Sequence, residues 1–136
     1  MIKTYSELIK IPDYNGRLDY LFLGDNNALS PRDISMDFYK SKLWIVTRSK
    51  IILRDNICDL GILTLPIDGK VIVHHINPIT REDILTLSSK LTDPENLITL
   101  TISTHNIIHY GVSNRFDDID IIERKAGDTI QWKKMF

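Results

Sequence analysis

Apolar residues in the first part of the chain recur at spacings that are typical of helices rather than strands. Thr4 and Glu7 have the spacing of a capping box, which predicts a short helix at the N-terminus. A second helical piece is predicted over residues 16–24, where leucines and a tyrosine crowd into a few turns. The N-terminal part is therefore expected to be helical.

The longest predicted helix runs from about Asp33 to Arg54 and is introduced by Ser30-Pro31, a capping serine before a proline. A second apolar ridge, formed by Trp44 and Ile51, indicates that this helix packs in two directions. Its main core-facing stripe repeats every seven residues and consists of Phe38, Ile45 and Ile52, with Val46 and Leu53 beside them.

The second half of the chain alternates strand-like runs with short helical segments. The dipeptide Asp68-Gly69 favours a type I′ turn, so residues 61–75 are predicted to form a β-hairpin. Three further elements are predicted in order: a helix from Thr80 to about Leu87, a β-prone run over residues 96–102, and a brief helix that Ser103 or Thr104 caps and Gly111 ends.

These elements predict one α+β domain, because 136 residues suffice for a single modest core. Residues 1–57 are its helical N-terminal part, residues 62–111 hold the hairpin and the elements after it, and residues 112–136 are a C-terminal extension expected to be mostly irregular. The formal net charge of −1 argues against a protein coated in positive charge, although a local basic face remains compatible with it.

Composition also restricts the location of the protein. The single cysteine, Cys58, cannot form an internal disulfide. No apolar run is long enough to span a bilayer, and the N-terminus lacks the apolar stretch of a signal peptide. We therefore expect no membrane partner and a cytoplasmic location in the cell that makes the protein.

All four histidines fall between residues 74 and 109. His105 and His109 are four residues apart on a predicted helix, so both imidazoles can point at one spot and form half of a transition-metal site. His74 and His75 end a strand, and adjacent strand residues point to opposite faces. One of these two can therefore complete a three-nitrogen site, while the other stays free to act as a base.

Each of these pieces also has a simpler structural interpretation. Taken alone, His105 and His109 are explained by two surface histidines on a polar helix face, and a histidine doublet by itself indicates little. The order and the spacing together favour a functional site. A strand ending in two histidines is followed by a loop, then Asn96 and a second strand, and then by the helix with His105 and His109.

The stretch from Val71 to Gly111, with "VHHINP" and "DPENLITLTISTHNIIHYG", resembles the HNH endonucleases, whose ββα-metal (His-Me finger) fold is built from those elements in that order. The resemblance implies a ββα-metal core with packed N-terminal helices. The flanking segments "FYKSKLWIVTRSKIILRDNICDLG" and "ERKAGDTIQW" are more loosely similar to small HNH proteins of tailed bacteriophages. That similarity implies a role in phage genome processing or packaging, with packaging proteins as possible partners.

The resemblance also implies a role for each motif residue. His74, His105 and His109 match the metal ligands, His75 matches the general base, and Asn96 matches the asparagine that holds the loop of the base. Such a protein hydrolyses phosphodiester bonds of DNA with one divalent metal ion. An all-nitrogen ligand set favours zinc, manganese, nickel or cobalt over magnesium (Mg).

Four basic residues are considered for contact with the DNA phosphates. Lys40, Lys50 and Arg54 gather on one side of the long predicted helix, and Arg81 follows the histidine doublet closely. A solvated helix face explains the first three equally well, and Arg81 is also an ordinary first-turn residue of a short helix.

The chain departs from many HNH proteins where a C-x-x-C zinc ribbon would stand, because this segment is Cys58-Asp59-Leu60-Gly61. We therefore expect apolar packing against the N-terminal helices to hold the fold, without a second zinc. Two other functions remain open. A free-standing homing or restriction-type nuclease would need a separate DNA-recognition element, and a catalytically silent metal-stabilised DNA-binding protein would bind without cutting.

Overall fold

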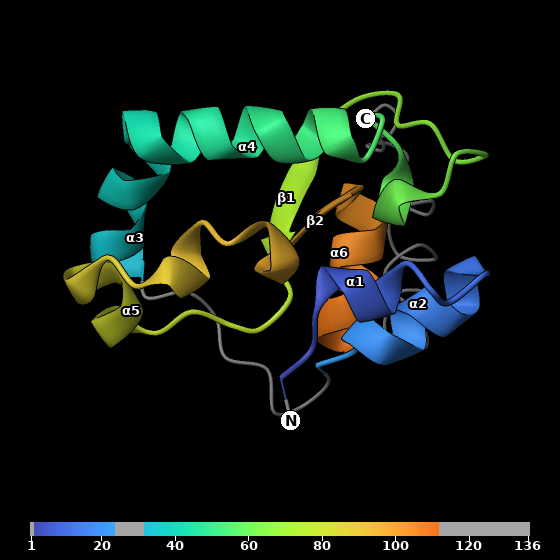
Figure 1. Ribbon diagram of the computed structural model, residues 1–136, viewed down its shortest axis with the longest axis horizontal. Helices are drawn as coiled ribbons and strands as arrows, with labels where there is room; N and C mark the ends of the chain where they lie inside the picture. Colours follow the sequence, from blue (N-terminus) through green and yellow to red (C-terminus); the bar gives the residue numbers. More distant parts are fainter. Residues whose placement is uncertain (1, 24–31, 112–136) are drawn as a thin grey trace, which may run out of the picture.

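The computed structural model describes residues 2–23 and 32–111 of the chain. The N-terminal helices, two α-helices joined at Ser41, a two-stranded sheet and a last helix follow one another (Figure 1). The elements are α1 (Tyr5–Leu8), α2 (Tyr14–Leu21), α3 (Arg32–Lys40), α4 (Lys42–Arg54), η2 (Asp59–Gly61), β1 (Ile72–His75), α5 (Arg81–Thr86), η3 (Ser89–Leu91), η4 (Pro94–Asn96), β2 (Leu97–Leu100) and α6 (Ile102–Tyr110).

Strands β1 and β2 pair antiparallel at the centre of the molecule, with His74 opposite Ile98 and His75 opposite Leu97. Helix α4 crosses one face of this sheet and α6 lies against the other (Figure 1). Helices α3 and α5 extend the α4 side, whereas α2 packs on α6. The mixture of helices with a small antiparallel sheet confirms the α+β class.

The sheet divides the core into two apolar clusters, because successive strand residues point to opposite faces. Every side chain of β2 is buried, so neither face of this strand meets solvent. The cluster on the α6 side contains Leu8, Leu18, Leu21, Leu60, Ile76, Ile98, Leu100 and Ile108. The cluster on the α4 side contains Phe38, Trp44, Ile51, Ile79, Ile84, Leu91 and Leu97.

The predicted N-terminal helices are confirmed. The hydroxyl of Thr4 accepts the Glu7 N–H at 3.2 Å and begins α1. Helix α2 starts slightly earlier than expected, because the carboxylate of Asp13 caps it by accepting the Gly16 N–H at 3.0 Å. Both caps satisfy N–H groups that the first turn of a helix leaves without partners.

The prediction of one helix from Asp33 to Arg54 is wrong, because Ser41 divides it into α3 and α4. The Ser41 hydroxyl donates to the carbonyl of Phe38 at 2.6 Å and accepts the Trp44 N–H at 3.2 Å, so it ends one helix and caps the next. The predicted core-facing stripe is wrong after Phe38, because Ile45 is 54% exposed and Leu53 is 71% exposed. In α4 the ridge of Trp44 and Ile51 is the one that faces the core.

The predicted hairpin at Asp68-Gly69 is also wrong, because within the described residues β1 pairs with β2 alone. The residues before the turn bond locally, with the Leu65 N–H donating to the Ile62 carbonyl at 2.8 Å. Pro66 has no N–H to give to a ladder, and it makes only an isolated bridge with Cys58. The partner of β1 is therefore a strand that lies further along the chain, and not one joined to it by a tight turn.

The later elements follow the predicted order. Thr80 begins α5 with a full capping box. Helix α6 is capped by Thr101 rather than by Ser103 or Thr104, and Gly111 ends it. The expected helix start at Ser30-Pro31 and the extension over residues 112–136 lie outside the described residues. No helix in the described ranges is both long and apolar enough to cross a membrane.

Candidate metal centre

Three histidines from two elements meet on the α6 side of the sheet. His74 comes from the end of β1, while His105 and His109 lie one turn apart on α6. Their potential ligand nitrogens all lie within 4.8 Å of one another. The ring centroids of His105 and His109 are 4.3 Å apart. The ring centroid of His74 lies 5.6 Å from that of His105 and 5.5 Å from that of His109. This arrangement could hold a metal ion.

The hydrogen bonding of the cluster fits a cation. Nε2 of His74 and Nδ1 of His109 are buried, and neither has a hydrogen-bond partner among the described residues. A buried polar atom without a hydrogen-bond partner lowers the stability of the fold by about 1–3 kcal/mol. A bound cation would give both nitrogens a partner and remove this cost. Imidazole nitrogens are also ordinary ligands of zinc and related transition metals, so the residues present fit such an ion.

Burial keeps these three imidazoles neutral. Desolvation lowers the pKa of His74 well below its ordinary value, and the neighbouring histidines lower it further. The pKa of His105 is lowered to about 4 by burial and by His109, and burial alone lowers the pKa of His109. Because only the neutral imidazole has a free lone pair, the cluster is in the ligating form at pH 7.

His75 lies on the opposite face of the sheet. Its ring stacks on Trp44 of α4, with centroids 5.3 Å apart, and Nε2 lies 2.9 Å from the carbonyl oxygen of Leu91. A carbonyl only accepts hydrogen bonds, so Nε2 carries the hydrogen in the neutral ring and the lone pair is on Nδ1. Desolvation lowers the pKa of His75, although the Leu91 carbonyl opposes this. His75 therefore lies apart from the cluster of His74, His105 and His109.

Asn96 ties together the two ends of the loop that separates β1 from β2. Its Oδ1 accepts the backbone N–H and the side-chain amide of Asn77, both at 2.7 Å. Its Nδ2 donates to the Lys90 carbonyl at 2.9 Å, one residue before the Leu91 carbonyl that binds His75. The side chain thus holds the loop that orients His75 and makes no direct bond to that histidine.

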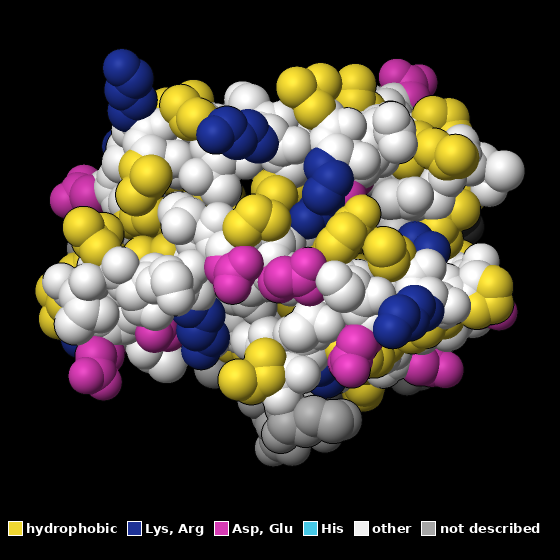
Figure 2. Space-filling model, in the orientation of Figure 1, with side chains coloured by type: hydrophobic (Ala, Val, Ile, Leu, Met, Phe, Trp, Pro, Cys, Tyr) yellow, Lys and Arg dark blue, Asp and Glu magenta, His cyan; other side chains and the backbone are white. Residues whose placement is uncertain are grey.

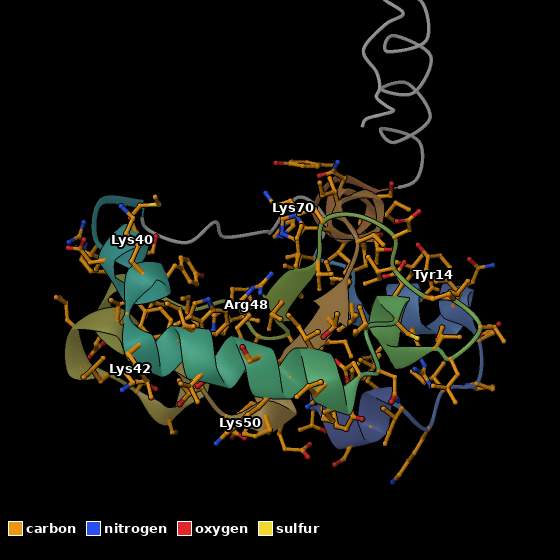
Figure 3. The ribbon with its side chains drawn as sticks, turned by 90° about the horizontal axis from the view of Figure 1, so that it is seen from above. Tyr14, Lys40, Lys42, Arg48, Lys50 and Lys70 are labelled. Atoms are coloured by element: carbon orange, nitrogen blue, oxygen red, sulfur yellow. The ribbon has the colours of Figure 1, made fainter. Side chains whose placement is uncertain are left out.

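The basic residues considered for DNA contact do not share one side of the molecule. Viewed from above, Lys40 lies with Arg48 and Lys70 on one side of α4, whereas Lys42 and Lys50 lie on the other side (Figure 3). Arg81 is in the exposed first turn of α5. No histidine is visible on the face shown in Figure 2.

Arg54 is engaged inside the fold. Its guanidinium donates to the Asp55 carboxylate at 2.8 Å and to the carbonyls of Pro94 and Leu97, both at 2.7 Å. It also lies over the ring of Tyr5, 3.5 Å from its centroid. These contacts join α4 to β2 and α1, so we assign Arg54 a structural role instead of a phosphate contact.

Sequence reasoning did not single out two basic residues that lie close to the start of β1 in the chain or in space, Arg48 and Lys70. Arg48 donates from α4 to the Val71 carbonyl at 2.8 Å, and Lys70 directly precedes Val71. The position of Lys70, two residues before the strand that ends in two histidines, was the available signal for it. Nothing in the sequence indicated Arg48, because its contact depends on how α4 crosses the sheet.

Comparison with known proteins gives no relative. No family model matches the chain, and neither a curated protein nor a solved structure does.

Proposed function

We propose that this protein is a metal-dependent DNA endonuclease that hydrolyses phosphodiester bonds. The observation that carries the proposal is the cluster of His74, His105 and His109 at the end of the strand that also bears His75. The chain order of β1, β2 and α6 supports it as well, because it matches the order of a ββα-metal core. A three-histidine set is typical of catalytic rather than structural ions, since it leaves coordination positions open.

In this proposal the three histidines hold one divalent ion. Such an ion supplies Lewis acidity for the charge that develops on the phosphate oxygens. The all-imidazole set suits zinc, nickel, cobalt or manganese better than magnesium. The chain itself contributes the burial that keeps the ligands neutral, and α6 holds His105 and His109 one above the other on the same face.

His75 acts as the general base in this proposal. The Leu91 carbonyl fixes its hydrogen on Nε2, so Nδ1 can accept a proton from water. The stacked ring of Trp44 and the loop held by Asn96 restrict the rotation of the imidazole. Holding the base in one orientation avoids the loss of rate that misalignment causes.

Nicking of supercoiled plasmid by the full chain tests the proposal, with Mn²⁺, Ni²⁺, Co²⁺, Zn²⁺ or Mg²⁺ and a chelator control. We expect His75→Ala to lose about 100-fold or more in rate, within the range for loss of a general base, while it binds the ion like the wild type. His105→Ala is expected to lose both the ion and the activity. Absence of nicking with every ion, or equal nicking by His75→Ala, would contradict the proposal.

The phosphate backbone is proposed to approach the side that carries Lys40, Arg48 and Lys70. Lys70 lies four residues before His74, about 13 Å along an extended chain, so DNA bound there is within reach of the cluster. Arg48 is oriented by its bond to the Val71 carbonyl, and Lys40 and Lys70 are exposed. Cations at these positions bind phosphates without reading the sequence.

Two double variants test this orientation. We expect Lys40→Ala/Lys70→Ala to weaken binding of a short DNA duplex about tenfold at low salt, and to reduce the slope of log K against log salt by roughly two, one for each lost contact. Lys42→Ala/Lys50→Ala is the matched control, because it removes two lysines from the other side of α4. Measuring binding with a chelator present separates it from cleavage. Equal weakening by the two variants would refute the orientation.

A metal-stabilised DNA-binding protein that does not cut is the second candidate. One observation favours it: His75 is only 7% exposed and packs against Trp44, on the face of the sheet opposite the cluster. This candidate predicts tight metal binding and DNA binding without nicking by any ion. The plasmid experiment with the wild type distinguishes the two functions directly.

A further inference from the structure

Asp59 is a buried carboxylate that neither the proposed ligand set nor the proposed base uses. It is 8% exposed and follows Cys58 in the loop after α4. Burial raises its pKa, whereas hydrogen bonds from Thr104 and Thr101 oppose that change. A buried carboxylate is costly unless several donors surround it, so its position needs an explanation.

The donors all come from the first turn of α6. The Thr101 N–H donates to Oδ1 of Asp59 at 3.2 Å, and the Thr101 hydroxyl lies 3.2 Å from Oδ2. The Thr104 hydroxyl donates to Oδ2 at 2.6 Å, which is short and typical of a charge-assisted bond. Asp59 therefore binds the helix at its cap and again within the first turn, directly before His105, a proposed ligand.

Tyr14 extends this network to α2. Its hydroxyl lies 2.7 Å from the Thr104 hydroxyl, and Thr104 has only one hydroxyl hydrogen, which it gives to Asp59. Tyr14 must accordingly be the donor. Thr104 is 0% exposed and is held from two sides, so α6 can neither rotate nor slide at this position without breaking both bonds.

The loop that delivers Asp59 is itself strained. Asn56, Ile57 and Leu60 have φ values of 58°, 56° and 55°, in the left-handed region that non-glycine residues rarely adopt. Such conformations are unfavourable and persist where the surroundings fix them. The buried guanidinium of Arg17 holds one of them, Leu60, by donating to its carbonyl. The fold thus maintains a costly conformation that places Asp59 under α6.

We propose that Asp59, acting through Thr104, is a positioning residue that sets the rotation of α6 and thereby the placement of His105 and His109 for the metal ion. The inference rests on the proposed metal centre. His74 is fixed independently by β1, so any rotation of α6 separates two ligand nitrogens from the third. A ligand set that must rearrange before it binds loses affinity.

The test compares metal affinity with stability in the metal-free state. Affinity for Co²⁺ and Zn²⁺ is measured by competition with a chromophoric chelator, and unfolding by urea in the presence of a chelator. We expect Asp59→Asn to bind about tenfold or more weakly, at the lower end of the range for loss of support around a metal ligand. The Co²⁺ absorption bands should also change, since they report the geometry of the bound ligands.

Asp55→Asn is the matched control. Asp55 is a buried carboxylate of the same loop, but it accepts the Thr99 N–H at 2.9 Å and thus anchors β2 instead of α6. We expect this variant to lose stability and to keep its metal affinity within about twofold. Equal losses of affinity in Asp55→Asn and Asp59→Asn would show a general effect of stability and overturn the inference.

Variants of Thr104 keep the test decisive where Asp59→Asn does not fold. Thr104→Val keeps the shape but removes the hydroxyl, and Thr104→Ser restores it. We expect weak binding in the valine variant and near wild-type binding in the serine variant. Folded Asp59→Asn or Thr104→Val with wild-type affinity overturns the inference and leaves the metal centre intact, whereas a wild type that binds neither ion overturns both.

Discussion

Replacing His74 by leucine should make the metal-free protein more stable. Nε2 of His74 is buried and has no hydrogen-bond partner among the described residues, so the folded state loses the hydration of that atom without compensation. Such a group costs about 1–3 kcal/mol. Leucine removes the polar atom and keeps a side chain of similar size at a position that is 7% exposed. We expect a gain of about 1–2 kcal/mol in the free energy of unfolding.

A metal ion should reverse that order. An ion that binds only the folded state adds about 2.7 kcal/mol at a free concentration of 100 times Kd. The wild type gains this contribution, whereas His74→Leu retains two of the three nitrogens and should gain little. The variant is therefore the more stable protein with chelator, and the wild type is the more stable protein with Zn²⁺.

Urea unfolding followed by circular dichroism at pH 7.5 measures both states. His75→Leu is the control, because Nε2 of His75 is already bonded to the Leu91 carbonyl. Its loss should cost about 1 kcal/mol with or without the ion. A His74→Leu variant that is less stable than the wild type in chelator would refute the argument from the unpaired nitrogen. The same stabilisation by Zn²⁺ in His74→Leu and wild type would refute its role as a ligand.

Three further outcomes are expected. The pKa of His105 is lowered to about 4 in the folded protein, so as the pH falls the unfolded chain binds a proton at higher pH than the folded chain does. The free energy of unfolding of the metal-free protein should therefore decrease by on the order of 2 kcal/mol between about pH 6.5 and pH 4, as measured by urea titrations. Arg54→Lys should lower the free energy of unfolding by about 1–3 kcal/mol through its lost carbonyl bonds, yet leave DNA affinity unchanged in a binding assay. In a Trp132→Phe variant, Trp44 is the one remaining tryptophan, and protonation of the stacked His75 should quench its fluorescence. Burial lowers the pKa of His75, so the midpoint of this titration should lie below pH 6.5. A midpoint at or above about pH 6.5 would contradict the burial of the ring.

Helical elements with a local start signal could be predicted from the sequence. Thr4 and Thr80 each cap a helix where their spacing to an acidic residue indicated one. Ser41 shows why the long helix failed: a serine within a helical pattern is read as a tolerated residue, and only the packing of α3 against α4 makes it a cap. The seven-residue repeat that predicted Ile45 in the core assumed one continuous helix, whereas in α4 the side that faces the core is that of Trp44 and Ile51.

The hairpin failed for a different reason. Asp68-Gly69 indicates only that the backbone favours a turn at this position. Whether two strands pair depends on whether both have backbone N–H and C=O groups available for the hydrogen bonds between them. Pro66 removes a donor from the near candidate, whereas Leu97–Leu100 offers an uninterrupted run. The correct partner lies more than twenty residues away, and no local pattern identifies it.

The histidine cluster was predictable because its geometry depends on two local periodicities. Residues four apart share a helix face, and neighbouring strand residues point to opposite faces, so His105 and His109 could be paired and the doublet divided without a structure. The polar anchors could not be predicted. Asp55, Asp59 and Arg17 are charged residues in unremarkable surroundings of the sequence, and only tertiary contacts bury them. The expectation that apolar packing alone holds the fold is therefore incomplete.

The division of the histidine doublet also restricts how a substrate can approach under the proposed function. His74 and His75 belong to opposite faces of the sheet, and β2 closes one edge of β1. A phosphate that reaches both side chains must then come to the other edge or to the end of β1, where the two faces meet. Arg48 donates to the carbonyl of Val71, directly before this strand, and Lys70 precedes Val71, so positive charge lies close to the same path. The variant Lys40→Ala/Lys70→Ala therefore tests whether DNA binds along the edge of β1. If this variant cleaved DNA as fast as the wild type, the phosphate would have to reach the histidines from another direction.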